Sequence, residues 1–571
     1  MTIKKLQTLR STLLQKQLDG FLVPRADAWP GEFVSNHAER LKWLSGFTGS
    51  AGMGIVLENK AVVLTDGRYT LQVAVQINSE IWESGDITKV SPDEWLLEHA
   101  AEESRIGFDA RLHSPSDIKK WEENLDKKEI ELVPLFENPL DDLWEDQPDL
   151  PKDPVFLFPE KFAGAGVVEK IDRVLEVLQE KELSQYFFTM PDSIAWLLNV
   201  RGNDVRHTPV PLSYGLLEQD GTFDWFIDPE KVPEAVRKEL GAAISIHPLA
   251  KMDDVLKDLK GTTGLDPKRS SYYFSQILPD IVEVEDPCIL LKACKNEAEQ
   301  KAIRQTHVHD GQALIEFHRW LKDNQDKNLD ELNVEKKLEE FRKANGVFIS
   351  PSFDTIAGYE ANGAIIHYRA TEQTNKVIKG EGLFLIDSGA QYLGEDYAGT
   401  TDVTRTYIIG KASNEQKHHY TTVLKAHITV ANARFPYGTT GVQIDALARA
   451  VMWQEGFDFA HGLGHGVGCF LNVHEEATRL SPYGDSKLEV GMLLSNEPGL
   501  YLEGQYGIRI ENLMLVQKTG EKDILGRDLL CFETVTLAPY DNDLIDFNLL
   551  NGAEIEWLQA YYEKIEAHLT L

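Results

Sequence analysis

Two aspartates that each adjoin a strand-like segment constrain this chain more than any other feature. Residues 383–386 form an apolar run that ends in Asp387, and after a turn-rich segment Asp402 lies among threonine and valine residues. Such residues favour β-strands, so two strands joined by a loop bring both carboxylates together. A carboxylate at the end of an apolar strand is costly unless an arginine or a cation compensates its charge. Strand alternation places the nearby Arg405 on the face opposite Thr404, although the stretch alone also fits a surface hairpin.

Length and charge limit the possible functions. A chain of 571 residues is too long for one hydrophobic core and indicates roughly two to four domains. Its 42% apolar and 26% charged residues are typical of a soluble globular protein. The formal charge of −34, from 58 basic and 92 acidic residues, disfavours binding to nucleic acid or to an anionic membrane surface.

Three further features predict a cytoplasmic location. The four cysteines are scattered without a CxxC pair, which suits free thiols in a reducing compartment. No stretch approaches the length of a membrane span. The N-terminal segment, with Leu6, Leu9 and Leu13 on one helical face, is typical of an amphipathic helix and not of a signal peptide.

The order of elements predicts three domains. The N-terminal helix opens a first α/β domain at 1–150, which ends in a linker rich in proline and aspartate. A second domain at 151–287 repeats the order helix, strand, Trp-Leu, glycine turn and hairpin, so the first two domains are expected to share a fold. A third domain at 288–571 begins with a long helix capped by Asn296. All of the candidate chemistry lies in this last domain.

Five polar residues recur at the ends of strand-like or glycine-flanked segments, namely Asp387, Asp402, His465, Glu497 and Glu511. Each one alone also fits a structural role as a cap, a core histidine or an ion-paired acid. Together, four carboxylates and one imidazole suit Mn²⁺, Mg²⁺ or Fe²⁺, or carboxylate-tolerant Zn²⁺ or Co²⁺. Four negative charges balance two divalent ions, which at about 3.5–4 Å apart can share one nucleophile.

The histidine-rich segment differs from the common helical zinc motif. His461 and His465 are four residues apart, but four glycines in HGLGHGVG make a helix improbable. The segment also lacks the glutamate that follows the first histidine in HExxH. Glycines at these positions instead let the backbone approach a site closely.

The motifs DSGAQY, TTDVTRT, HGLGHGVG with NVHE, NEPGLY and GIRIEN appear in this order. The series resembles that of aminopeptidase P (Xaa-Pro aminopeptidase) of the long, three-domain cytosolic type. The resemblance extends to SGFTGSAG and TDGRY, to IAWLLNVRG, and to FETVTLAP near the C-terminus. It implies two creatinase-like N-terminal α/β domains, an α+β catalytic domain of the pita-bread fold with a C-terminal extension, and a homodimer. It also implies two Mn²⁺ ions, with Zn²⁺, Co²⁺ or Fe²⁺ as alternatives.

The resemblance assigns the five candidate ligands to two metal ions. Asp387 would bind one ion through both oxygens, and Asp402 and Glu511 would bridge the pair. His465 and Glu497 would complete the coordination of the other ion. The reaction implied is hydrolysis of the bond between an N-terminal residue and a following proline, by a hydroxide that bridges the two ions.

Four more residues match substrate-contacting positions of the family. His367 would hold the leaving-side peptide group or shuttle a proton, His474 would contact the scissile carbonyl, and His461 would line the proline pocket. Arg68, in TDGRY, would contact the substrate from the first domain. Glu497 would accept the proton of the attacking water.

Two departures and three alternatives remain. The loop QYLGEDYAGTTD is longer than is usual for the family, and EATRL follows NVHE where a glycine-proline is common. A prolidase acting on Xaa-Pro dipeptides is the nearest enzymatic alternative, although prolidases generally lack the additional domain. A metal-free peptide- or histone-binding protein of the same fold, or a creatinase-type hydrolase without metals, would be expected to carry substitutions among the five ligands. This chain carries none.

Overall fold

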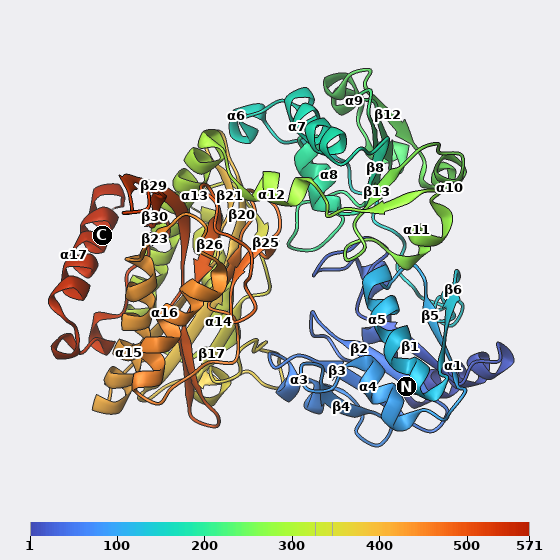
Figure 1. Cartoon of the computed structure of the whole chain (residues 1–571). Coiled ribbons are helices and arrows are strands. Elements are labelled where there is room, and N and C mark those ends of the chain that lie inside the picture. The colour runs from blue at the N-terminus through green and yellow to red at the C-terminus, as the bar shows by residue number, and fades with distance from the viewer. Residues whose placement is uncertain (1, 326, 345, 570–571) are drawn as a thin grey trace. The chain divides into compact units, whose positions relative to one another are not determined.

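The computed structural model describes residues 2–325, 327–344 and 346–569. It consists of two compact units, which Figure 1 colours from blue to green and from green to red along the chain. The N-terminal unit comprises Met1–Glu160 and Ala165–Ile289, and the C-terminal unit comprises Lys161–Gly164 and Leu290–Leu571. Within the described residues, no helix combines the length and the apolar character needed to cross a membrane. The boundaries predicted for three domains stay a prediction.

The N-terminal unit contains two six-stranded sheets with matching strand order. The first has the order β4-β3-β2-β1-β5-β6, with strands at Gly20–Pro24 (β1), Met53–Leu57 (β2), Ala61–Thr65 (β3), Glu83–Asp86 (β4), Arg105–Asp109 (β5) and Glu131–Leu135 (β6). The second has the order β12-β11-β10-β8-β13-β14, with strands at Gln185–Phe188 (β8), Tyr214–Glu218 (β10), Phe223–Phe226 (β11), Ile244–His247 (β12), Thr263–Leu265 (β13) and Ile281–Glu283 (β14).

The two sheets also agree in strand direction. In each sheet the first strand in sequence, β1 or β8, pairs antiparallel with one strand of a hairpin and parallel with a strand on its other side. The hairpins are β2–β3 and β10–β11. The predicted internal duplication is therefore confirmed at the level of topology.

Short helices accompany both sheets of the N-terminal unit, at Thr2–Gln15 (α1), Arg40–Ser45 (α2), Thr70–Gln76 (α3), Pro92–His99 (α4), Pro115–Leu125 (α5), Val167–Glu180 (α7), Pro191–Leu197 (α8), Glu234–Leu240 (α9), Met252–Lys257 (α10) and Tyr272–Ile277 (α11). The predicted amphipathic helix is confirmed by α1, which buries Leu6, Leu9 and Leu13. Burial of this apolar face against the sheet, and not intrinsic propensity, accounts for most of the stability of such a helix.

The C-terminal unit contains the helices Glu297–Asp323 (α13), Glu331–Ala344 (α14), Asn414–Ala431 (α15), Gly441–Gln454 (α16) and Gly552–His568 (α17). The predicted cap of the first helix is confirmed, because the Asn296 side chain accepts hydrogen bonds from the N–H groups of Ala298 and Glu299. Two sheets carry the candidate site. Helices α13 and α14 pack against one of them, and α15, α16 and α17 pack against the other.

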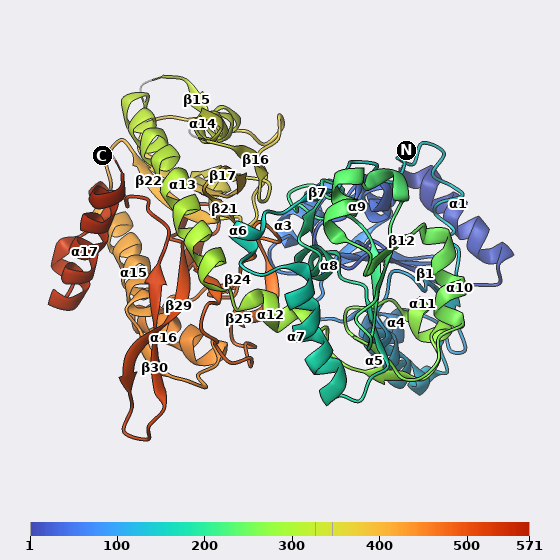
Figure 2. The same cartoon turned by 90° about the horizontal axis from the view of Figure 1, so that it is seen from above.

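One sheet has the order β17-β19-β22, with strands Ile356–Tyr359, Gly382–Ser388 and Val403–Ile409. The other has the order β23-β30-β29-β26-β24-β25, with strands Arg434–Pro436, Asp528–Thr534, Asn512–Lys522, Leu493–Asn496, Gly464–Gly466 and Glu475–Leu480. The β29–β30 hairpin extends beyond the rest of this sheet (Figure 2). Shorter sheets are formed by Phe348–Pro351 (β16), Ala390–Leu393 (β20) and Ala398–Thr400 (β21), and by Gly499–Leu502 (β27) and Tyr506–Arg509 (β28).

Apolar side chains cover both faces of β19. Phe384 and Ile386 belong to a core that includes Phe317 of α13, whereas Leu383 and Leu385 belong to cores on the other side. A strand buried on both faces reads as a continuous apolar run, which explains the sequence before Asp387. The packing fixes the strand end, and with it the aspartate that follows.

Candidate metal centre

The two aspartates lie at facing ends of one antiparallel strand pair. Asp387 is the second-last residue of β19 and pairs with Thr404 of β22, and Asp402 directly precedes β22. The long loop between them folds into the β20–β21 hairpin. This hairpin lies outside the β19–β22 ladder, in a sheet with β16, so both aspartates keep adjacent positions.

The other three candidate ligands lie in the six-stranded sheet or next to the ends of its strands. His465 is the middle residue of β24, Glu497 follows β26, and Glu511 lies between β28 and β29. The Glu511 N–H donates to the carbonyl of Thr404 at 3.1 Å, and the Thr404 hydroxyl donates to Glu511 Oε2 at 2.7 Å. These two bonds join the residue before β29, an interior strand of the six-stranded sheet, to β22, the strand that follows Asp402.

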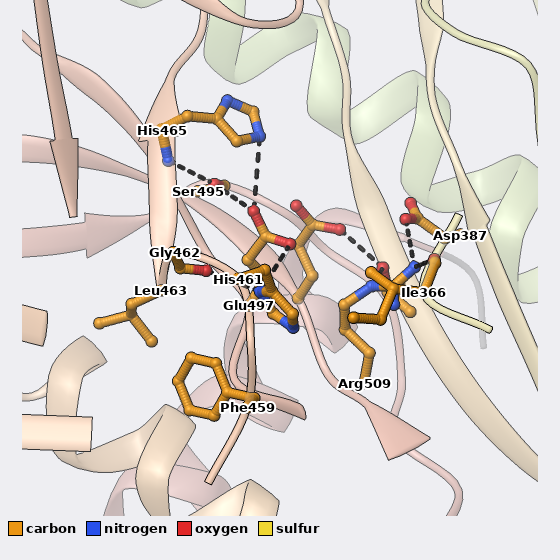
Figure 3. A network of polar contacts seen from close by, with 12 residues as sticks. Ile366, Asp387, Phe459, His461, Gly462, Leu463, His465, Ser495, Glu497 and Arg509 are labelled. Carbon is orange, nitrogen blue, oxygen red and sulfur yellow. Dashed lines mark hydrogen bonds and ion pairs between the residues drawn. The ribbon is translucent and has the colours of Figure 1, made fainter. Parts of the chain in front are cut away.

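All five predicted ligands come together in the structure. Asp387, Asp402 and Glu511 place ligand atoms within 4.8 Å of one another, and so do His465, Glu497 and Glu511. A third group within the same distance joins Asp402 and His465 to His474. Figure 3 shows His465 and Glu497 on one side of the cluster and Asp387 with Arg509 on the other. Two groups of ligands that share one carboxylate fit two neighbouring cations better than one.

The orientation of His465 suits a metal ligand. Its Nδ1 faces the carbonyl of Gly466 at 2.9 Å, and because a carbonyl only accepts, Nδ1 carries the proton. Its Nε2 lies 3.4 Å from Asp402 Oδ2 and 3.5 Å from Glu497 Oε1. The lone pair of Nε2 therefore faces two carboxylates, and a cation between them would remove the repulsion. Metal-binding histidines usually donate a hydrogen bond from their other ring nitrogen, as His465 does here to a backbone carbonyl.

The carboxylates of the site cannot all be ionised without a compensating cation. Burial, with the nearby Asp387 and Glu497, raises the pKa of Asp402 well above its usual range. Burial, with Asp402, does the same to the pKa of Glu511, and burial, with Glu511, raises the pKa of Glu497 to about 8. Asp387 Oδ1 is buried and has no hydrogen-bond partner among the described residues. A clustered set of oxygen ligands with an unpartnered oxygen fits divalent cations.

Arg509 is a part of the site that the sequence analysis did not identify. It is buried, and its Nη2 donates to Asp387 Oδ2 at 2.6 Å. Its Nη1 donates to the Tyr501 hydroxyl at 2.7 Å, and this hydroxyl lies 2.9 Å from His461 Nε2. One positive charge thus compensates one of four carboxylates. The signal for Arg509 was its position in GIRIEN, two residues before the predicted ligand Glu511.

His427 is a second residue near the site that the sequence analysis did not identify. It is buried on α15, where Nδ1 donates to the carbonyl of Asn496 at 3.0 Å and Nε2 accepts from Asn512 Nδ2 at 3.1 Å. Burial, together with the charge of Arg405, lowers the pKa of His427 to about 3 and keeps the imidazole neutral. Asn496 and Asn512 are register partners that directly adjoin Glu497 and Glu511. No sequence motif marks His427, because its partners come from distant strands.

The predicted substrate-contacting histidines lie at different places around the cluster. The His474 ring is perpendicular to that of His465, with centroids 4.3 Å apart. The His461 ring lies 4.9 Å from that of Phe459. His367 lies in a turn directly after Ile366, whose carbonyl accepts from Arg509 Nη2 at 3.5 Å.

Arg68 belongs to the N-terminal unit, in the turn between β3 and α3. Its guanidinium forms an ion pair with Asp66 at 2.7 Å and lies 3.8 Å from Glu32. Its predicted contact with substrate stays a prediction. So do the roles assigned to the five ligands and the three histidines.

The apolar run at residues 469–473 is strand-like in sequence. The structure has a bent loop there, and the next strand, β25, begins at Glu475. Phe470 adopts a φ of 51°, which a strand does not allow. Apolar residues in this short run are buried because the loop is packed, and burial alone does not distinguish a strand from a tight loop.

Comparison with known proteins agrees with this arrangement. Residues 301–518 match metallopeptidase family M24, and residues 528–570 match the C-terminal region of peptidase M24. Residues 5–138 and 146–299 each match the creatinase/prolidase N-terminal domain. The fold and the ligand cluster therefore define a metallopeptidase of family M24 with two creatinase-type N-terminal domains.

Two fungal relatives resemble the whole chain. A protein named "Probable Xaa-Pro aminopeptidase P" from Ajellomyces capsulatus is 37% identical over 597 residues, which cover 99% of this chain and 95% of that protein. A protein of the same name from Laccaria bicolor is 37% identical over 584 residues, covering 98% and 89%. The chain belongs to the Xaa-Pro aminopeptidase P family.

Solved structures give the same result. The X-prolyl aminopeptidase of Caenorhabditis elegans, described as a cytosolic enzyme with a di-nuclear active site, has a TM-score of 0.94 at 31% identity and covers 100% of this chain and 96% of its own. An Xaa-Pro dipeptidase from Bacillus anthracis has a TM-score of 0.54 at 26% identity and covers 66% of this chain and 99% of its own. The dipeptidase thus leaves about a third of this chain without a counterpart.

Proposed function

We propose that this protein is a dinuclear metal-dependent aminopeptidase that hydrolyses the bond between an N-terminal residue and a following proline in peptides. The observation that carries the proposal is the pair of ligand groups that share Glu511. The raised pKa values of three carboxylates and the unpartnered Asp387 oxygen support two cations there. The family relationship supports the choice of substrate.

Asp387, Asp402, His465, Glu497 and Glu511 would hold two divalent ions, and such ions would supply a hydroxide nucleophile near neutral pH. Glu497 accepts the proton of the attacking water. His474, beside His465, and His367, in the loop fixed to Arg509, stabilise the negative charge that develops on the substrate carbonyl oxygen. His461, whose ring lies 4.9 Å from that of Phe459, lines the pocket for the proline ring.

The choice of proline follows from the chemistry of its nitrogen. An Xaa-Pro bond has no N–H, so it cannot donate the hydrogen bond that general aminopeptidases take from the residue after the cleaved bond. A pocket built from ring faces can hold the pyrrolidine without that bond.

The oxygen-rich ligand set favours Mn²⁺, and Zn²⁺, Co²⁺ and Fe²⁺ remain alternatives. We also propose a homodimer in the cytoplasm, as the family relationship suggests. The four cysteines are free thiols, which agrees with a reducing compartment.

Cleavage of Arg-Pro-Pro tests the function, and the dipeptide Arg-Pro is the control. Protein loaded with Mn²⁺ should release arginine from the tripeptide faster than from the dipeptide. A faster reaction with the dipeptide would support a prolidase, and failure to cleave either peptide while two ions are bound would contradict the proposed function.

A further inference from the structure

Residues 468–475 are here called the His474 loop. They have no regular secondary structure until β25 begins at Glu475, but polar contacts fix their backbone. The Gly468 N–H donates to the carbonyl of Asn472 at 2.9 Å, and the buried Phe470 between them has a φ of 51°. A residue other than glycine keeps such a backbone conformation only where its surroundings enforce it. Two sets of buried polar contacts hold the loop, one before and one after His474.

The first set comes from the β20–β21 hairpin. Gln391 Nε2 donates to the carbonyl of Leu471 at 2.7 Å. Thr400, the register partner of Gln391, accepts from the Leu471 N–H at 3.3 Å and donates to Gln391 Oε1 at 2.8 Å. Both side chains are fully buried. The hairpin between the two aspartate ligands therefore binds both backbone groups of Leu471, three residues before His474.

The second set is an ion pair directly after His474. Glu475 pairs with Lys295, and their side chains are 2% and 0% exposed. The Lys295 backbone is itself fixed, because its N–H donates to the carbonyl of Gly491 at 3.2 Å and its carbonyl accepts from Gln300 Nε2 at 2.8 Å. Any side chain at Gly491 would place a Cβ 2.4 Å from the Lys295 oxygen.

A buried ion pair adds little stability compared with apolar side chains of similar volume, because both charges lose their hydration. Such a pair instead fixes a geometry, since each charge tolerates few alternative positions. Here the pair fixes the residue that adjoins His474, while the contacts of Leu471 fix the chain that leads to it.

We infer that Gln391 and the Lys295–Glu475 pair are positioning residues that hold the His474 imidazole at its place beside His465. The inference rests on the proposed function, in which His474 stabilises the oxyanion. A displacement of about 1 Å in such a group can cost roughly 10²-fold in rate. Loss of an anchor should therefore lower kcat and leave bound metal unchanged, since the five ligands do not include the anchors.

A double-mutant cycle between Gln391 and His474 tests this inference. Gln391→Met removes the amide donor to the Leu471 carbonyl at nearly constant volume and leaves no charge unpaired. The Thr400 hydroxyl, 3.2 Å from that carbonyl, remains. The substitution should lower kcat for Arg-Pro-Pro by roughly tenfold in the wild-type background and by less than about twofold in the His474→Ala background, because coupled residues are not additive. Bound Mn²⁺, measured by metal analysis, should stay at the wild-type level in all four proteins.

Gln185→Met is the matched control. Gln185 is a buried glutamine of the N-terminal unit whose Nε2 donates to Thr263 Oγ1 at 2.7 Å, so it resembles the Gln391–Thr400 pair. Its substitution should lower thermal stability as Gln391→Met does and leave kcat unchanged. An equal loss of kcat in the control would show that the effect of Gln391→Met reflects general destabilisation, and would overturn the inference.

A second cycle removes both charges of the ion pair, with Lys295→Met and Glu475→Gln together, so that no charge is stranded. Lys231→Met with Asp204→Asn is its control, because that pair is also buried. Equal fold losses of kcat with and without His474, or unchanged kcat in both cycles, would refute the positioning role. A wild-type protein that binds two ions and cleaves no Xaa-Pro peptide would refute the proposed function itself.

Discussion

Removal of the metal ions should make the stability of the C-terminal unit fall steeply as pH rises. Burial, together with Glu511, raises the pKa of Glu497 to about 8, whereas its usual value is 4.5. Between these two values the metal-free folded protein holds a proton on Glu497 that the unfolded chain has released. The folded state then binds more protons than the unfolded state, so the free energy of unfolding decreases with increasing pH.

The size of this effect follows from the two pKa values of Glu497, a residue with an 18% exposed side chain. At about 1.4 kcal/mol per pKa unit, the free energy of unfolding decreases by at most about 5 kcal/mol between pH 4.5 and pH 8. Asp402 and Glu511 act in the same direction, because their pKa values are also raised. For a unit of this size, about 5 kcal/mol corresponds to a Tm lower by about 10 °C.

Scanning calorimetry of chelator-treated protein between pH 5 and pH 8 measures this effect, and the transition that shifts on addition of Mn²⁺ belongs to the C-terminal unit. With Mn²⁺ present the Tm should no longer fall with increasing pH, because bound cations replace the protons on the carboxylates of the site. Glu497→Gln is the control, and its metal-free Tm should depend less on pH. A metal-free Tm that is constant or rises from pH 5 to pH 8 would refute the electrostatic reasoning.

Three other predictions concern the ligands, the histidines and the assembly. Asp387→Asn, Asp402→Asn and Glu511→Gln should each abolish Arg-Pro-Pro cleavage and reduce bound metal, because neutral amides cannot balance the charge of the ions; wild-type turnover in any of them would remove that residue from the ligand set. His474→Ala should keep both ions and lose about 10²–10³-fold in kcat, whereas His465→Ala should lose metal first and regain part of its activity in excess Mn²⁺. The opposite pattern would mean that the two histidine roles are exchanged. Light scattering should give twice the 64.4 kDa of one chain, and a monomer at micromolar concentration would contradict the dimer.

The sequence predicted those parts of the site that follow from strand periodicity. The apolar run before Asp387 and the threonine-rich run after Asp402 form the expected antiparallel pair. The face assigned to Arg405 was also right, because its guanidinium donates to backbone carbonyls and to Asn512, and not to Asp387. Alternation along a strand is a local property, so it can be read without knowledge of the partners.

Contacts between distant segments were beyond such local analysis. The partner of Asp387 is Arg509, 122 residues further along the chain. The anchors of the His474 loop come from Lys295 and Gln391, which are 180 and 80 residues from their partners. Each pairing depends on how sheets and helices pack, and one sequence without known contacts does not specify that packing.

The most direct test of a dinuclear Xaa-Pro aminopeptidase is a titration of the metal-free protein with Mn²⁺ while release of arginine from Arg-Pro-Pro is measured. Bound metal should saturate at two ions per chain, in agreement with the two ligand groups that share Glu511, and release of arginine should reach its maximum at the same point. Saturation at one ion or none, or full occupancy of two ions without release of arginine, would contradict the proposed site and its function.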